Sequence, residues 1–260
     1  MDHVLYLSYG KDSTACLGAI KELDWPLSRV ITAEVWATDT IPADLPPMVE
    51  FKATVDAFVK DRFGIEVEHF RAKQSFESGF YLTRGRTGLK TKHTGEIYGW
   101  PMTRGSWCLQ QLKRPVFTST PKEDVSYIGI AADEPNRFGQ LTGTKVSPLV
   151  ELGWTEADCR RWCEENGLLS PIYTTTMRGG CWFCPKQPTG QLRFLRKNYP
   201  DYWAMMLKWD KDSFVPFHPD GHTVHDYDRR FQMEDDGLIH PDDKIFRWAM
   251  LDDYLNYRLF

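Results

Sequence analysis

Short apolar runs rich in β-branched residues alternate with helix-compatible stretches along the first half of the chain. Such runs are typical of buried strands, and we expect strands at residues 4–7, 29–38, 65–70 and 127–131. Helices are expected at residues 13–23 and 48–63, the second preceded by prolines and stopped by Gly64. Strands that alternate with helices predict an α/β fold with a doubly wound, mostly parallel sheet.

The pattern changes twice further along the chain. Residues 71–106 lose hydrophobic periodicity, and a connection of that length is usually functional or disordered. A helix then resumes after Thr155, its expected N-cap, with Asp158 completing a variant of the capping box. Residues 190–260 are rich in aromatic and acidic residues and are predicted to form helices. We therefore expect two parts, a domain at residues 1–185 that includes a cysteine-containing insertion and a helical C-terminal extension at residues 186–260.

The composition is that of an ordinary globular protein, with 42% hydrophobic and 26% charged residues among 260. A formal net charge of -4 gives no overall basic signal for nucleic acid. One segment is nevertheless basic enough to line an acceptor site, through Arg84, Arg86, Lys90, Lys92, His93 and Arg104. The sequence has no apolar run of membrane-spanning length and no signal-type N-terminus, so we expect a cytoplasmic protein with no membrane partner.

The first chemical signal is the loop at residues 8–13, Ser-Tyr-Gly-Lys-Asp-Ser, called the phosphate loop below. It follows the first expected strand and opens a helix, so backbone N–H groups and the helix dipole should converge on one anion site. Gly10 would permit a tight backbone, Lys11 would add a charge, and Ser8 and Ser13 would donate to phosphate oxygens. The alternative is an ordinary strand-to-helix turn with solvated polar residues.

This loop resembles the Ser-Gly-Gly-Lys-Asp-Ser loop of the PP-loop ATP pyrophosphatases, with Tyr9 standing where glycine is usual. Other segments, in the same order along most of the chain, are similar to the phosphoadenosine phosphosulfate (PAPS) reductase family of that class. They are Asp39-Thr40, the Trp-Cys…Leu-Lys segment at residues 104–113, the Gly-Ile-Ala-Ala-Asp-Glu segment at 129–137 and the Ser-Pro-Leu-Val step at 147–150. The resemblance implies an adenine nucleotide alpha hydrolase-like fold.

The resemblance also implies an enzyme with a binding site for an adenine nucleotide, namely ATP together with Mg²⁺. The residues implied to bind the nucleotide are Ser8, Tyr9, Gly10, Lys11, Asp12, Ser13, Asp39, Thr40, Asp133, Glu134 and Arg137. Those implied to act in catalysis are Lys11, Asp12 and Lys113. Simpler interpretations stay open: Asp39 could cap a loop, Asp133 and Glu134 could form a solvated turn, and Lys113 could be a surface residue.

The second chemical signal is Cys181-Trp-Phe-Cys184-Pro, a spacing that suits one metal ion or a cluster iron. Resemblance to the cluster-bearing reductases implies that Cys108, Cys181 and Cys184 hold an iron–sulfur cluster of the 4Fe–4S type. Leu109 stands where those proteins have another cysteine, which leaves Cys163, a histidine or an open iron for the fourth position. A zinc site, a redox dithiol and a pair of inert thiols are the alternatives.

The chain has no cysteine after Cys184, so it lacks the C-terminal nucleophile with which PAPS reductases attack their substrate. The main hypothesis is therefore ATP-dependent adenylation followed by sulfur transfer to a nucleobase or nucleic acid, with a possible sulfur-donor protein as partner. The alternatives are a PAPS reductase-like sulfonucleotide oxidoreductase that uses an external thiol, and a zinc-stabilised nucleotide-binding module. Histidines and acids near the C-terminus, namely His218, His222, His225, Asp226 and Asp228, are expected to be solvated loop residues.

Overall fold

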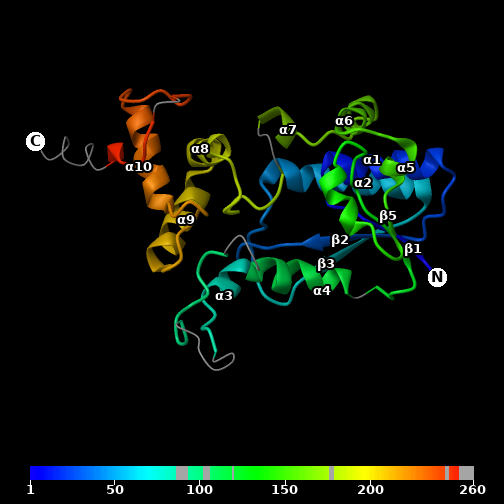
Figure 1. Cartoon of the computed structure of the whole chain (residues 1–260), viewed down its shortest axis with the longest axis horizontal. Helices are drawn as coiled ribbons and strands as arrows, with labels where there is room; N and C mark the ends of the chain where they lie inside the picture. Colours follow the sequence, from blue (N-terminus) through cyan, green and yellow to red (C-terminus); the bar gives the residue numbers. More distant parts are fainter. Residues whose placement is uncertain (86–92, 102–105, 119, 176–178, 244–245, 252–260) are drawn as a thin grey trace, which may run out of the picture. The chain divides into compact units, whose positions relative to one another are not determined.

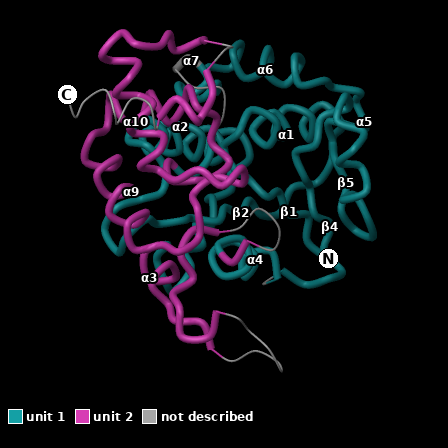
Figure 2. The backbone as a smooth tube through the Cα atoms, turned by 60° about the vertical axis from the view of Figure 1, so that its left-hand side comes forward, with its two compact units in different colours: residues 1–76, 108–181 teal, residues 77–107, 182–260 magenta. Residues whose placement is uncertain are grey.

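The structure is a computed structural model that describes residues 1–85, 93–101, 106–118, 120–175, 179–243 and 246–251. The chain forms two compact units, each built from two segments (Figure 2). Unit 1 is Met1–Phe76 with Cys108–Cys181, and unit 2 is Glu77–Trp107 with Trp182–Phe260. The expected division into residues 1–185 and 186–260 stays a prediction. In the structure, residues 77–107 belong to the same compact unit as the C-terminal segment.

Unit 1 contains one five-stranded sheet in which every strand pairs in parallel. The strands are β1 His3–Tyr6, β2 Arg29–Glu34, β3 Val67–Arg71, β4 Val125–Tyr127 and β5 Lys145–Val146. Their order is β3-β2-β1-β4-β5, so the chain first builds outward on one side of β1 and then returns to its other side. The predicted α/β fold with a parallel sheet is confirmed. Crevices at such reversal points are the usual ligand sites of open α/β sheets.

Helices cover both faces of this sheet (Figure 1). One face carries α1 Lys11–Glu22, α2 Pro46–Phe63, α5 Pro148–Leu152 and α6 Glu156–Glu165, and the other carries α4 Arg114–Phe117. Strand alternation explains how both faces are filled. Leu5 and Val30 belong to the large core beneath α1 and α2, whereas Val4 and Ile31 pack with Val116 of α4.

Local signals in the sequence account for the predicted helix ends. Gly64 ends α2 with φ 69°, a left-handed conformation that glycine adopts without steric cost. Thr155 and Asp158 form a complete capping box at the start of α6. The prolines expected to precede α2 instead begin it, because Pro46 and Pro47 occupy the first turn, where a missing N–H costs nothing.

Two strands end earlier than the sequence predicts. The strand expected at 29–38 ends at Glu34, because Trp36 pairs with Pro42 across a tight turn. The strand expected at 127–131 ends at Tyr127. The two-residue strand β5 was not predicted, because a run that short carries no period.

Unit 2 is organised by aromatic side chains. Its described elements include α3 Phe76–Phe80, which begins at the last residue of a unit 1 segment, with α8 Thr189–Asn198, α9 Pro200–Asp212 and α10 Val224–Asp235. Trp100 and Trp209 are fully buried and pack against each other and against Phe80. The buried carboxylate of Asp210 accepts a hydrogen bond from the Trp100 indole at 3.0 Å. Over the described residues, neither unit has a helix long and apolar enough to cross a membrane.

The remaining elements are short helical turns. In unit 1 they are η1 Leu109–Lys113, which is a π-helix, the 3₁₀ turn η2 Pro135–Gln140, and α7 Ile172–Thr175. π-Helical turns occur often at functional sites, so the position of Lys113 at the end of η1 is of interest.

Gly129 follows β4 where the backbone comes very close to α1. A Cβ atom there would lie 2.7 Å from the backbone nitrogen of Ser13 and 2.8 Å from its Cα. Backbone cannot move aside as a flexible side chain can, so Gly129→Ala should force the two segments apart. We expect a loss of about 1–3 kcal/mol in the free energy of unfolding, measured by urea denaturation.

The control for this prediction is Gly139→Ala. A Cβ atom at Gly139 would meet no other atom within 4 Å, and the φ of this glycine lies outside the left-handed region. This variant should change the free energy of unfolding by less than about 0.5 kcal/mol. Equal stability of the two variants would contradict the close approach at Gly129.

Candidate functional site

A cavity of about 350 Å³ opens in unit 1 at the carboxyl ends of β1 and β2. Leu7 and Ser8 continue β1 into it, and Thr32 and Ala33 of β2 form a second wall. The polar and reactive groups that also line it come from separate segments: Tyr9, Asp44, Lys52, Lys113, Tyr173 and Cys181. The carboxyl edge of a parallel sheet is where ligands bind in open α/β folds. The structure thus brings Ser8, Tyr9, Gly10, Lys113 and Cys181, all predicted site residues, to one cavity.

The phosphate loop joins this cavity to the N-terminus of α1. Gly10 is the N-cap and provides no side-chain acceptor to the first turn. The backbone N–H of Lys11 donates to the hydroxyl of Tyr173 at 3.1 Å. An anion that replaced this hydroxyl would meet the positive end of the helix.

The two serines of the phosphate loop bond to each other. Ser8 Oγ and Ser13 Oγ lie 2.9 Å apart, and the Ser13 hydroxyl donates to the carbonyl of Gly10 at 3.0 Å. Ser13 is almost completely buried, so its hydroxyl closes the loop internally. The predicted role of Ser13 as a phosphate donor stays a prediction, and it would require this bond to be exchanged.

The tight point in the phosphate loop is Tyr9 and not Gly10, contrary to the expectation from sequence. Gly10 is extended, with φ -77° and ψ 156°, whereas Tyr9 has φ 57°. A left-handed conformation costs a residue other than glycine about 1–2 kcal/mol, so contacts of the Tyr9 side chain must offset it. The ring is buried, and its hydroxyl donates to Asp56 Oδ1 at 2.6 Å.

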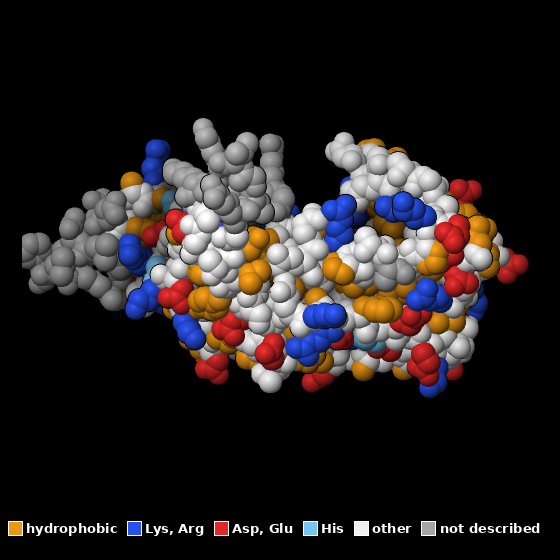
Figure 3. All heavy atoms as spheres, turned by 90° about the horizontal axis from the view of Figure 1, so that it is seen from below, with side chains coloured by type: hydrophobic (Ala, Val, Ile, Leu, Met, Phe, Trp, Pro, Cys, Tyr) orange, Lys and Arg blue, Asp and Glu red, His pale blue; other side chains and the backbone are white. Residues whose placement is uncertain are grey.

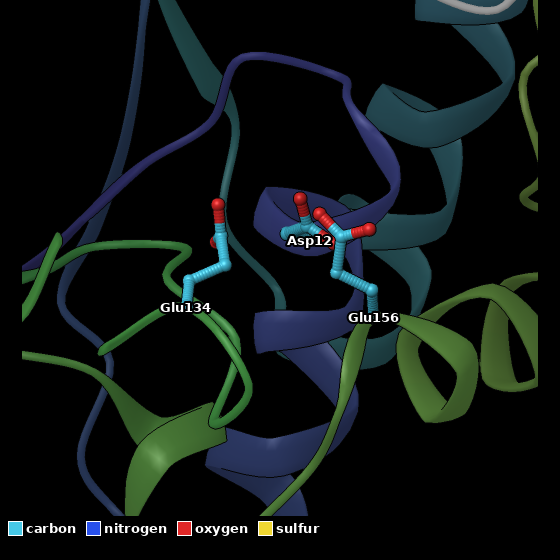
Figure 4. A group of neighbouring side chains, drawn as sticks. All are labelled: Asp12, Glu134 and Glu156. Atoms are coloured by element: carbon cyan, nitrogen blue, oxygen red, sulfur yellow. The ribbon is translucent and has the colours of Figure 1, made fainter. Parts of the chain in front are cut away.

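Lys11 points away from the cavity lining, toward carboxylates. Its Nζ lies 2.7 Å from Asp12 Oδ1 and 3.4 Å from Glu156 Oε1. Oxygen atoms of Asp12, Glu134 and Glu156 all lie within 4.8 Å of one another, and Figure 4 shows these side chains coming from three segments. The sequence does not single out Glu156, because nothing near it in the chain signals that α6 begins beside the phosphate loop.

Burial and charge shift the titration of this acidic cluster in a consistent way. Burial raises the pKa of Asp12, Lys11 opposes the rise, and the charges of Glu156 and Glu134 reinforce it, so the pKa is raised. Burial alone would lower the pKa of Lys11, but hydrogen bonds and charges from Asp12 and Glu156 raise it overall. The cluster therefore holds Lys11 firmly in its charged form.

The other predicted nucleotide-binding residues are used in local structure. Asp133 accepts from the backbone N–H of Glu156 at 2.9 Å and so caps α6. Glu134 is paired with Arg137 at 2.8 Å and also accepts from the backbone N–H of Ala131. A role for Asp133, Glu134 or Arg137 in binding nucleotide stays a prediction.

Asp39 and Thr40 lie exposed in the turn after β2 and are not among the cavity-lining residues. The turn is held by the hydroxyl of Thr38, which accepts from the backbone N–H groups of Thr40 and Ile41. Arg71, at the end of β3, donates to the carbonyl of Asp39 at 2.9 Å. Arg71 thereby fixes a loop that the sequence alone associated with the nucleotide.

The six cysteines separate into two groups. Cys16, Cys159 and Cys163, the last a candidate for the fourth cluster position, are completely buried in the core that joins α1 to α6. Burial raises the pKa of Cys159 and of Cys163 to about 12, and the Cys163 thiol donates to the carbonyl of Lys11 at 3.4 Å.

The three cysteines predicted to hold a metal are all partly exposed. Cys108 directly precedes η1, and Cys181 lines the cavity of unit 1. Cys184 belongs to unit 2. Their joint role as metal ligands stays a prediction.

The basic segment and the C-terminal histidines lie in unit 2. Arg86, Lys90, Lys92 and Arg104 are outside the described residues. Arg84 donates to the carbonyl of Tyr98, and His93 stacks on Phe214. On the face in Figure 3, basic side chains are interspersed with acidic ones over the described part of the chain.

The histidines and acids near the C-terminus were expected in a solvated loop, but several belong to the start of α10. Asp226 forms a capping box with Thr223, and Asp228 accepts from Arg196 at 2.8 Å. His225 Nδ1 lies 2.6 Å from the buried carboxylate of Asp210. These contacts give the group a structural role in unit 2.

Comparison with known proteins returns no match: no family model, no curated protein and no solved structure corresponds to this chain. The resemblance to the PP-loop class therefore rests on the motifs described above. The site itself offers anion binding at the start of α1, beside a cavity with lysines and a thiol.

In the absence of divalent cations, Glu156→Gln should strengthen the binding of inorganic pyrophosphate by about threefold to tenfold, measured by isothermal titration calorimetry. The substitution removes one carboxylate that holds Lys11 and would repel an anion at the phosphate loop. The matched control is Glu164→Gln on the same helix, where the glutamate pairs with Arg160. Similar affinities in both variants and the unchanged protein would exclude a competing role of Glu156 at the anion site.

Proposed function

We propose that unit 1 binds ATP, with the phosphates at the phosphate loop and the rest of the nucleotide in the adjoining cavity. The observation that carries this proposal is that Ser8, Tyr9 and Gly10, which lead directly into α1, also line the cavity. A helix N-terminus stabilises phosphate, and a cavity of about 350 Å³ lies within the range of small-molecule sites. The motif resemblance supports the same assignment.

The proposed reaction is adenylation of an acceptor oxygen on a nucleobase or nucleic acid. The acceptor oxygen attacks the α-phosphorus of ATP, pyrophosphate leaves, and a sulfur nucleophile then displaces AMP from the activated carbon or phosphorus. Lys11 would leave its carboxylate partners to neutralise the phosphates, and Lys113, which lines the cavity, would act on them as a second cation. The negative charge that develops on the departing pyrophosphate favours a site with such cations.

A magnesium ion fits the oxygen donors beside the phosphate loop. Mg²⁺ is held by carboxylate and phosphate oxygens, and the carboxylates that would hold it are Asp12, Glu134 and Glu156. Bound there, the ion would supply charge neutralisation at the phosphate oxygens. Lys11 and Arg137 now offset part of the charge of these carboxylates.

An iron–sulfur cluster is the second group that the proposal includes. Thiols are suitable ligands for it, and Cys108, Cys181 and Cys184 would hold it, with zinc as the alternative. When bound, a cluster with an open iron would supply sulfide for transfer. Since Cys181 also lines the cavity, its thiol would lie beside the proposed nucleotide site.

Lys11→Ala should lower acceptor-dependent pyrophosphate release from ATP by at least about a hundredfold, because it removes a cation from the proposed phosphate site. The measurement is a coupled pyrophosphate assay with nucleic acid as acceptor, on protein shown to be folded by circular dichroism. The control is Lys21→Ala, an exposed lysine in the last turn of the same helix. Binding of a sulfated or 3′-phosphorylated adenine nucleotide without pyrophosphate release would support the sulfonucleotide oxidoreductase instead.

Protein purified without oxygen should contain about four iron and four sulfide per chain and no zinc, because three thiols match the cluster ligands of the resemblance. Elemental analysis, acid-labile sulfide determination and an absorption spectrum measure this. Cys181→Ser should lose the iron, whereas the control Cys159→Ser changes a buried core thiol and should retain it. Stoichiometric zinc without sulfide would replace the cluster in the proposal by a structural metal site.

A further inference from the structure

Tyr9 takes the one position in the phosphate loop where the backbone is left-handed, with φ 57°. It and Asp24 are the two residues other than glycine with positive φ in the described chain. Its side chain is 1% exposed and lines the cavity floor. A conformation this unfavourable persists only where surrounding contacts determine it.

The anchor of Tyr9 is a hydrogen bond to α2. The phenol donates to Asp56 Oδ1 at 2.6 Å, and the Lys52 ammonium lies over the ring at 5.1 Å from its centre. Burial and the neighbouring carboxylates, Asp56 first among them, raise the pKa of Tyr9 well above its usual range, so the phenol stays a donor at all physiological pH. The loop is therefore tied to α2 through one side chain.

Asp56 is in turn bound to β3 and, through it, to β2. His69 Nε2 lies 3.0 Å from Asp56 Oδ2, and His69 Nδ1 lies 2.8 Å from Glu34 Oε1. Burial would raise the pKa of Glu34, but hydrogen bonds from His69 and Trp36 lower it overall. A chain of polar contacts thus runs from the phosphate loop to the edge strand of the sheet.

Both ring nitrogens of His69 face a carboxylate. A neutral imidazole has one N–H and can donate to one of them, whereas the doubly protonated ring donates to both. The groups facing the ring are Asp56 from α2, Glu34 from β2 and the Tyr9 hydroxyl, 3.4 Å from Nε2. Lys52 of α2 acts on Glu34 and on Tyr9.

We propose that Tyr9 is the positioning residue of the phosphate loop, and that the His69 bridge between Asp56 and Glu34 holds it in place. The ligand whose affinity it sets is a di- or triphosphate group, so this inference rests on the proposed function of the loop. Tyr9 acts through the backbone of the loop and takes no part in bond making.

The test measures inorganic pyrophosphate binding by calorimetry at pH 6, 7 and 8. Tyr9→Phe keeps the buried ring and removes the bond to Asp56, so affinity should fall about tenfold at each pH. The matched control is Tyr127→Phe, a tyrosine equally buried whose hydroxyl donates to the carbonyl of Pro26. It should bind pyrophosphate as the unchanged protein does.

A second variant tests the bridge behind Tyr9. His69→Gln breaks the bridge between Asp56 and Glu34, so the affinity for pyrophosphate should fall about threefold, in the same direction as in Tyr9→Phe. His3→Gln is the control, since His3 bonds the Tyr127 hydroxyl at the start of β1. An affinity that is the same in His69→Gln and in the unchanged protein overturns the role of His69.

Amide hydrogen exchange of residues 8–13 tests Tyr9 without any ligand. In the Tyr9→Phe variant, these amides should exchange about tenfold faster than they do in the Tyr127→Phe variant. If the unchanged protein binds no pyrophosphate and no ATP, the proposed function fails, and this exchange measurement still decides the inference. Equal exchange in the two variants refutes the anchoring of the loop by Tyr9.

Discussion

The close backbone contact between Gly129 and the first turn of α1 is the constraint on which the site depends. It binds the segment after β4 to the start of the helix, on the side of β1 where the strand order reverses. That contact sets Glu134 beside Asp12, and the capping of α6 by Asp133 adds Glu156. The segments that carry Glu134 and Glu156 both reach the start of α1, because Gly129 places no side chain between its own segment and the helix.

Electrostatic balance at this terminus follows from the same packing. The start of α1 and Lys11 are positive, and the protein supplies carboxylates of its own to compensate for them. An incoming polyanion must compete with these internal partners, so binding exchanges one set of ion pairs for another. Lys52 and Lys113 line the adjoining cavity and would add positive charge to the same proposed site.

Features set by neighbouring residues could be predicted from the sequence, and those set by distant ones could not. The ends of α2 and α6 follow from Gly64 and from Thr155 with Asp158. The phosphate loop was placed correctly after β1, because the alternation of strand and helix is a local signal. The left-handed Tyr9 was missed because its partner Asp56 lies on another helix, and nothing in the sequence signals that pairing. The partner of Lys11 on α6 was missed for the same reason.

The discontinuous composition of unit 2 has a consequence for biosynthesis. Trp100 leaves the ribosome well before α9, whose Asp210 and Trp209 contact its indole in the finished protein. Until that helix is translated, the large aromatic ring and its N–H donor lack the partners that α9 supplies. The nascent chain must therefore carry an incompletely covered tryptophan while the second segment of unit 1 is made, which is the kind of state that chaperones bind.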